Sequence, residues 1–252
     1  MEKNTNIPPA LLNKCCRILY NEKRDTFWFV SHLRTMTSNV HAYTSSGKQR
    51  VFIKFDSLVE CMELDKDGNA YIITSAACTI YNNQGQYVSM IGMVETWGWV
   101  VEMTIHEQQG NVLVVCGTRR FSAYDIDGES ETRHIPTQST TNTMDGICTN
   151  SRGDVITRGS KLIECFDVNY TPLFSIKNEI GGLYGLFVDT SDRLVYYTYS
   201  RIGIREGDWK AVKEAELEDL TYGKCTVTDD CFYRIDKGGM CIWKLKLDKD
   251  SI

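Results

Sequence analysis

Basic residues recur in short loops along this 252-residue chain, each loop following a β-rich run. The loops carry Arg34, Arg119 with Arg120, Arg158 with Lys161, Arg201, and Lys237, and neighbouring loops add Trp97, Trp99, Tyr184 and Tyr222. Arginine beside exposed aromatic rings is enriched at protein interfaces, and it also suits stacking on single-stranded nucleic acid. We therefore predict recognition of a protein or peptide partner with acidic character, and RNA is the alternative. Ordinary solvated turns also carry lysine and arginine, so this plainer interpretation stays open.

Acidic residues form a second candidate constellation. Glu60, Asp145, Tyr184 and Tyr222 occupy equivalent positions of a repeat, and Glu102 lies close to the same register. Converging carboxylates hold hard cations such as Ca²⁺ through oxygen ligands, and a metal-dependent hydrolase would be the second alternative function. Such an enzyme needs further ligands and a general base, but no Asn and none of the four His aligns with these positions. Ion pairs with Arg34 or Arg158 explain the carboxylates equally well.

Other chemistry lacks sequence support. The chain has no G-x-S-x-G elbow, P-loop or G-x-G-x-x-G motif, and none of its ten cysteines forms a C-x-x-C pair. Zinc is therefore unsupported, and most cysteines lie in alternating apolar runs that favour reduced core thiols over disulfides. We predict a non-enzymatic protein without a cofactor or catalytic residues.

Composition narrows the class of partner. The chain is 42% hydrophobic and 24% charged with a net charge of -5, which argues against bulk, non-specific nucleic-acid binding by the whole surface. No DNA partner is expected. No apolar run approaches the roughly 18 to 20 residues that span a bilayer, and the N-terminal stretch lacks a signal-peptide core. We expect a cytoplasmic protein that does not bind membranes.

A repeated polar turn must position all these residues. Its clearest copy is "DKDGN" at residues 65–69, and related turns recur about every 40 residues, near Arg24, Gly110, Gly153, Asp192 and Asp230. A second series stays in register with the first, including "VHAYTSSG", "CTIYNNQG" and "FSAYDIDG", each interpreted as a strand ending at a tight turn. Two series in register predict six tandem units of four short antiparallel strands.

Such a sheet has two faces that it cannot bury alone, and stacking six around an axis buries them. The expected fold is all-β, a six-bladed β-propeller in one domain over residues 1–252. The blades are expected at about 15–56, 57–93, 94–137, 138–180, 181–219, and 220–252 with 1–14. The last unit has room for only three strands, so we predict that the N-terminal segment supplies its outermost strand. Residues 208–220 are predicted to hold an outer strand and a loop rather than a helix.

The stretches "ECMELDKDGNAYIITSAACTIYNNQGQ" and "MDGICTNSRGDVITRGSKLIECFDVNYTPL" resemble NHL-type repeats: an inner strand, a D-x-x-G turn, a second strand and a polar tip. The resemblance covers nearly the whole chain, although the last two units are diverged. The chain is similar to the C-terminal propellers of tripartite-motif (TRIM-NHL) ubiquitin ligases. That family implies a propeller that recognises a protein or RNA partner. The sequence has no upstream zinc module, so ligase activity is not expected. The ending "CIWKLKL" resembles a WD-type blade, and the carboxylates resemble calcium-dependent propeller lactonases in outline.

Overall fold

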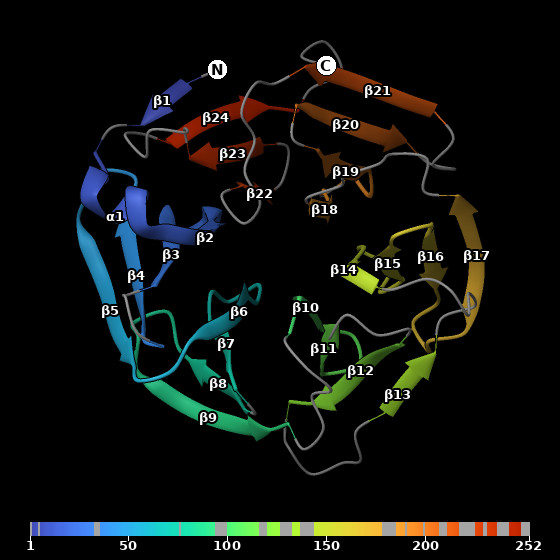
Figure 1. Ribbon diagram of the computed structural model, residues 1–252, viewed down its shortest axis with the longest axis horizontal. Coiled ribbons are helices and arrows are strands. Elements are labelled where there is room, and N and C mark those ends of the chain that lie inside the picture. Colours follow the sequence, from blue (N-terminus) through green and yellow to red (C-terminus); the bar gives the residue numbers. More distant parts are fainter. Residues whose placement is uncertain are drawn as a thin grey trace. The chain divides into compact units, whose positions relative to one another are not determined.

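The computed structural model describes residues 2–4, 6–32, 36–75, 77–93, 100–115, 120–126, 133–136, 144–177, 185–189, 191–198, 200–206, 211–216, 225–228, 231–235 and 242–247. In these ranges the chain forms six four-stranded antiparallel sheets (Figure 1). The sheets are the blades of a six-bladed β-propeller, so the predicted all-β fold class is confirmed. The described part also holds a short helix, α1 (Pro9–Lys14), which the sequence did not predict. No helix among these residues is both long and apolar enough to cross a membrane.

The chain divides into two compact units, which are described separately. Unit 1 comprises Met1–Val59 with Gly182–Ile252. Its three sheets are β2 (Cys15–Asn21), β3 (Thr26–His32), β4 (Ser38–Thr44) and β5 (Gln49–Phe55); β18 (Gly185–Val188), β19 (Leu194–Tyr197), β20 (Arg201–Glu206) and β21 (Ala211–Glu216); and β22 (Cys225–Thr228), β23 (Cys231–Ile235), β24 (Ile242–Lys246) and β1 (Glu2–Asn4). β21 is the outer strand expected within residues 208–220.

Unit 2 comprises Glu60–Gly181. Its sheets are β6 (Val59–Leu64), β7 (Ala70–Thr74), β8 (Ala77–Tyr81) and β9 (Tyr87–Gly92); β10 (Glu102–His106), β11 (Asn111–Val115), β12 (Arg120–Asp125) and β13 (Arg133–Pro136); and β14 (Met144–Thr149), β15 (Val155–Gly159), β16 (Leu162–Phe166) and β17 (Pro172–Lys177). Each sheet follows chain order from its first strand to its fourth.

The N-terminal strand completes the sheet that ends the chain. β1 pairs antiparallel with β24, joining Glu2 to Lys244 and Asn4 to Ile242, and the two strands lie side by side in Figure 1. Beyond β1, Ile7 and Leu12 are fully buried and fix the segment to the rest of unit 1. The predicted contribution of the N-terminal segment to the last blade is therefore confirmed.

A five-residue turn explains the repeated D-x-x-G pattern. Its first residue accepts hydrogen bonds from the backbone N–H groups two and four positions later; Asp65 accepts from Asp67 at 2.9 Å and Asn69 at 2.8 Å. Asn82, Asn150, Asp167 and Asp189 act in the same way. The fourth position has a positive φ and holds Gly68, Gly85, Gly153, Tyr170 and Asp192. Glycine adopts this conformation at little cost, so the sequence motif follows from the turn geometry.

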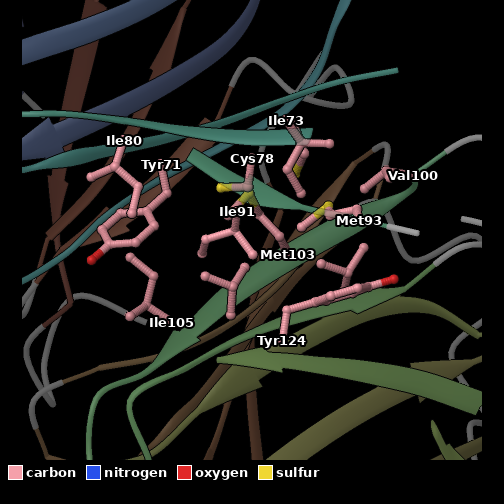
Figure 2. Close-up of a cluster of buried hydrophobic side chains, with 13 residues drawn as sticks. Tyr71, Ile73, Cys78, Ile80, Ile91, Met93, Val100, Met103, Ile105 and Tyr124 are labelled. Carbon is pink, nitrogen blue, oxygen red and sulfur yellow. The ribbon is translucent and has the colours of Figure 1, made fainter. Parts of the chain in front are cut away.

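Cores lie between neighbouring sheets within each unit. In unit 2, Tyr71 and Ile73 of β7 and Ile91 of β9 pack against Met103 and Ile105 of β10 (Figure 2). These side chains recur at alternate positions because successive residues of a strand point to opposite faces. Second strands are buried on both faces, as all five residues of β15 are, whereas the outer strand β17 is largely exposed.

The cysteines belong to these cores. No disulfide joins the eight cysteines that the structure describes, and all of them except Cys16 are buried. Burial raises the pKa of the Cys78 thiol to about 12. A thiol that stays protonated at neutral pH is a poor nucleophile, so Cys78 acts as a small apolar core residue.

Candidate functional site

The structure describes four of the ten residues predicted to bind a partner. Arg34, Trp97, Arg119, Tyr184, Tyr222 and Lys237 lie outside the described residues, as does Trp99. Arg120 begins β12, Lys161 lies in the turn between β15 and β16, and Arg201 begins β20. Lys161 is exposed and Arg120 is partly exposed, so both present positive charge on unit 2. Arg201 of unit 1 is exposed, with its Nη1 3.4 Å from Glu214 Oε2.

Arg158 differs from the other basic residues because it is only 3% exposed. It pairs with Gly146 across β14 and β15, and its side chain lies over that glycine. A Cβ at position 146 would lie 3.0 Å from Arg158 Nε, so glycine provides the space that the guanidinium occupies. Arg158 therefore does not offer an exposed charge, and sequence could not reveal this because the glycine is on the adjacent strand.

In the constellation predicted to hold a cation, the side chains of two acidic residues are described, and both form hydrogen bonds with nearby groups. Glu60 Oε2 accepts a hydrogen bond from Val100 N at 2.9 Å, and Glu102 Oε1 accepts one from Met103 N at 3.3 Å. The side chains of Asp145, Tyr184 and Tyr222 lie outside the described residues. Within the described ranges, no three His, Cys, Asp or Glu side chains are grouped as a metal site requires. Glu60 instead ties the second sheet to the segment that leads into β10.

An outer strand of unit 2 has unusual surface chemistry. Tyr87, Val88 and Met90 of β9 are 63%, 55% and 58% exposed, while Ile91 points into the core. β9 pairs with β8 on one side and ends the sheet order β6-β7-β8-β9. The strand has the sequence YVSMIG, with no charge and no proline. The sequence analysis predicted outer strands but did not consider how far the apolar side chains of residues 87–90 are exposed.

A pocket of about 650 Å³ lies in unit 1, and we call it the N-terminal pocket. Its walls come from the end of β1 and the residues after it, the β2–β3 hairpin, the β4–β5 turn, and strands β23 and β24. Asn4 and Asn6 each donate from Nδ2 to the carbonyl of Ser45, at 2.9 and 3.0 Å. The N-terminal segment is thereby fixed against the β4–β5 turn and forms one wall.

Asp25 is the polar centre of the N-terminal pocket. Tyr20 donates its hydroxyl to Asp25 Oδ1 at 2.8 Å, and Ser45 donates its hydroxyl to Oδ2. Burial, together with the Asp25 carboxylate, raises the pKa of the Tyr20 phenol well above its ordinary value. Tyr20 therefore keeps its proton at neutral pH and remains a hydrogen-bond donor.

Three aromatic rings form the apolar side of the same pocket. The Tyr20 ring centroid lies 4.4 Å from that of Phe27 and 4.6 Å from that of Tyr233. Phe27 and Tyr233 are each 3% exposed, so the core holds their rings in place. Lys244 Nζ lies 5.8 Å from the Tyr233 ring centroid, which is within cation–π range. No sequence signal marked this pocket, because its residues come from four separate stretches of chain.

A smaller pocket of about 330 Å³ lies in unit 2 beside His106. His106 is buried, and its Nδ1 lies 3.1 Å from the Tyr170 hydroxyl, which also accepts from Asn111 Nδ2 at 2.8 Å. Burial lowers the pKa of His106, so the ring is neutral at pH 7. The three side chains tie the β10–β11 hairpin to the β16–β17 turn, and this network is chiefly structural.

Comparison with known proteins establishes the fold alone. No protein-family model matches the sequence, and no curated protein matches it. Among solved structures, virginiamycin B lyase from Staphylococcus aureus aligns with TM-score 0.61 and 12% identity, covering 93% of this chain and 84% of that one. A streptogramin B lyase aligns at 0.63 and 12%, covering 99% and 88%. The β-propeller domain of Myceliophteria thermophila Cps50 (Swd1) aligns at 0.65 and 12%, covering 94% and 88%. The similarity is thus to propellers in general, with no specific tie to NHL or TRIM proteins.

Proposed function

We propose that this chain is a non-enzymatic recognition module that binds an extended segment of a partner protein along the edge of β9. The single observation that carries the proposal is the exposure of three apolar side chains, Tyr87, Val88 and Met90, on an edge strand without charge. An edge strand presents unpaired N–H and C=O groups, and a partner strand satisfies them by extending the sheet. The β-propeller fold is consistent with such a scaffold.

The other outer strands carry features that discourage strand addition. Arg50 and Lys54 lie in β5, Pro136 ends β13, Pro172 begins β17, and Lys213 lies in β21. Charges and prolines of this kind protect natural sheet edges. Among the outer strands of the described chain, β9 has neither charge nor proline, and its pairing with β8 has one register shift, between Ile80 and Tyr81. The absence of charge and proline supports a role in binding.

The chemistry of β9 also indicates the kind of segment that binds. A charged partner residue buried against Val88 or Met90 would lose hydration without gaining an opposite charge. Burying each of these apolar side chains fully is worth about 1.5 to 3 kcal/mol. The expected ligand is therefore an extended, uncharged segment with apolar residues at alternate positions. In this proposal, an acidic region elsewhere on the same partner contacts Arg120 and Lys161 of unit 2.

A peptide-display selection tests this proposal with a defined probe. Random dodecapeptides selected on the intact chain should be enriched in uncharged, alternating apolar sequences. Synthetic copies should protect the backbone amides of β9 from hydrogen exchange. The double variant Val88→Lys, Met90→Lys should weaken their binding at least tenfold, because two ammonium groups would lie beside the apolar side chains of the added strand. Leu173→Lys on the outer strand β17, where Leu173 is 51% exposed, is the matched control and should bind normally.

Two results would count against β9 as the partner site. Selected peptides that bind the double variant as well as the parent chain would place recognition elsewhere. Sedimentation showing a dimer of the chain alone, which the same double variant dissociates, would make β9 a self-association edge instead.

Salt dependence separates the remaining alternatives. Selection of acidic peptides whose affinity falls steeply as salt rises would favour the basic loops as the binding site. The same salt dependence for RNA oligonucleotides would favour RNA as the ligand.

A further inference from the structure

We infer that the N-terminal pocket binds a small neutral saccharide, a ligand class separate from the protein partner proposed above. Its volume of about 650 Å³ falls within the roughly 300 to 1,000 Å³ typical of small-molecule sites. The pocket combines hydroxyl, amide and carboxylate groups with an aromatic wall. A sugar ring needs polar groups and an aromatic surface together, since its hydroxyls form a polar rim around apolar C–H faces.

The charges of the pocket favour a neutral ligand. Asp25 contributes a carboxylate and Lys244 an ammonium group, and both residues line the same space. For a simple anion or a simple cation, the repulsion by one of these groups opposes the attraction by the other. A polyhydroxylated ligand meets neither repulsion, because each hydroxyl can donate to the carboxylate and accept from the ammonium.

The hydrogen-bonding groups are already oriented. Asp25 is held by the hydroxyls of Tyr20 and Ser45, and its φ of 48° is fixed by the β2–β3 turn. An ionised carboxylate has about four acceptor positions, so two bonds leave capacity for a ligand hydroxyl. Ser46 adds a hydroxyl from the neighbouring turn, which lies 2.8 Å from the Thr44 hydroxyl and keeps further hydrogen-bonding capacity. Little conformational entropy is therefore lost when the ligand binds.

The aromatic wall is equally rigid. Phe27 and Tyr233 meet at 5.5 Å between ring centroids in an edge arrangement, and both belong to the buried cluster of unit 1. Because Phe27 and Tyr233 are almost fully covered, the ring surface open to a ligand belongs to the half-buried Tyr20, whose hydroxyl is donated to Asp25. Aromatic side chains with one apolar face and one polar tip suit ligands of mixed character.

Titration by NMR with a fixed panel tests the inference. The probes are glucose, galactose, mannose, N-acetylglucosamine and maltose, with glycine betaine and inorganic phosphate as zwitterionic and anionic comparisons. At least one sugar should shift the amides of Asp25, Ser45 and Ser46 saturably, with millimolar or tighter affinity. Tyr20→Phe, which keeps the packed ring and removes the hydroxyl, should weaken binding about tenfold, the loss expected for one hydrogen bond to a charged network.

Matched variants make the outcome decisive. Asp25→Asn keeps a residue type that tolerates positive φ but removes the charge, and it should also weaken sugar binding. Asp192→Asn is the control, since Asp192 also has a positive φ, of 57°, and lies in another turn. The inference fails if no sugar of the panel binds saturably, if only betaine or phosphate binds, or if Tyr20→Phe binds sugar as tightly as the parent chain.

Discussion

At the scale of single residues, the acceptor at the start of five of the turns holds the turn in place. Asp65 Oδ1 accepts from two backbone N–H groups, and Asp65 Oδ2 accepts from Asn69 Nδ2 at 2.7 Å. These bonds hold the chain reversal that sets the register of β6 and β7. The side chain thus acts as a local substitute for backbone pairing within the turn.

Asp65→Ala should lower the free energy of unfolding by about 1 to 2 kcal/mol, because it removes a side-chain acceptor shared by two backbone donors. Asp65→Asn keeps the Oδ1 acceptor and should cost clearly less. Urea denaturation of the three proteins measures the difference. Equal losses for both variants would mean that charge, and not the turn hydrogen bonds, accounts for the effect.

Two histidines that are partly or fully removed from solvent give the protein a predictable response to acid. Burial lowers the pKa of His106 and of His41 below the ordinary value of 6.5. The unfolded chain therefore binds protons on these rings at a higher pH than the folded chain does. Their contribution to stability is complete above about pH 6.5 and is lost as the pH falls below that value.

Stability should therefore drop as the pH falls from about 6.5 to 5.5, and His106→Gln should reduce the slope. One histidine contributes at most about 1.4 kcal/mol per pH unit within this window. Denaturant midpoints at several pH values, for the parent chain and the variant, give the two slopes. The difference between the two slopes removes the contribution of the carboxylates, which titrate in both proteins. Identical slopes would show that His106 is not desolvated in the folded state.

At the scale of elements, the sequence predicted the features that depend on residues close together in the chain, such as turns and the strands that they join. The turn motif gave the strand pairs, and counting strands gave the role of the N-terminal segment in the last sheet. α1 was missed because its six residues are too few to establish a helical period, although Leu11 and Leu12 are buried. The burial of Arg158 depends on Gly146 of the adjacent strand, and the N-terminal pocket joins distant turns. Such features depend on tertiary contacts, which no local pattern reports.

Three glycines allow two causes of strain to be distinguished: a positive φ, and a close contact at the position of a Cβ atom. Gly47 has a φ of 86°, and a Cβ there would lie 2.3 Å from the carbonyl oxygen of Asn6. Gly110 has a φ of 65° with nothing near its Cβ position, and Gly92 meets neither constraint. Gly47→Ala should therefore cost the most stability, Gly110→Ala about 1 kcal/mol, and Gly92→Ala little. Thermal unfolding gives the order, and a loss at Gly110 as large as at Gly47 would refute the contact with Asn6.

At the scale of the whole molecule, the six sheets are stabilised by cores that lie between blades. In unit 1 one cluster includes Ile18 and Phe29 from the first sheet with Ile235 and Ile242 from the last. Ile7 and Leu12 belong to that cluster, so the N-terminal segment covers the core as well as extending the sheet. Residues from the two ends of the chain thus share one core, and its stability depends on both.

Deleting residues 1–7 should therefore destabilise unit 1 by several kcal/mol. The deletion removes the pairing of β1 with β24, and the loss of fully buried Ile7 alone costs about 2 to 5 kcal/mol by comparison with large-to-small core substitutions. Hydrogen exchange measured by mass spectrometry should show the greatest loss of protection in β22, β23 and β24. β7, in unit 2, is the internal reference and should lose less. Unchanged protection of β24 would mean that the N-terminal strand adds nothing to the last blade, and its apparent role in completing the sheet would have to be abandoned.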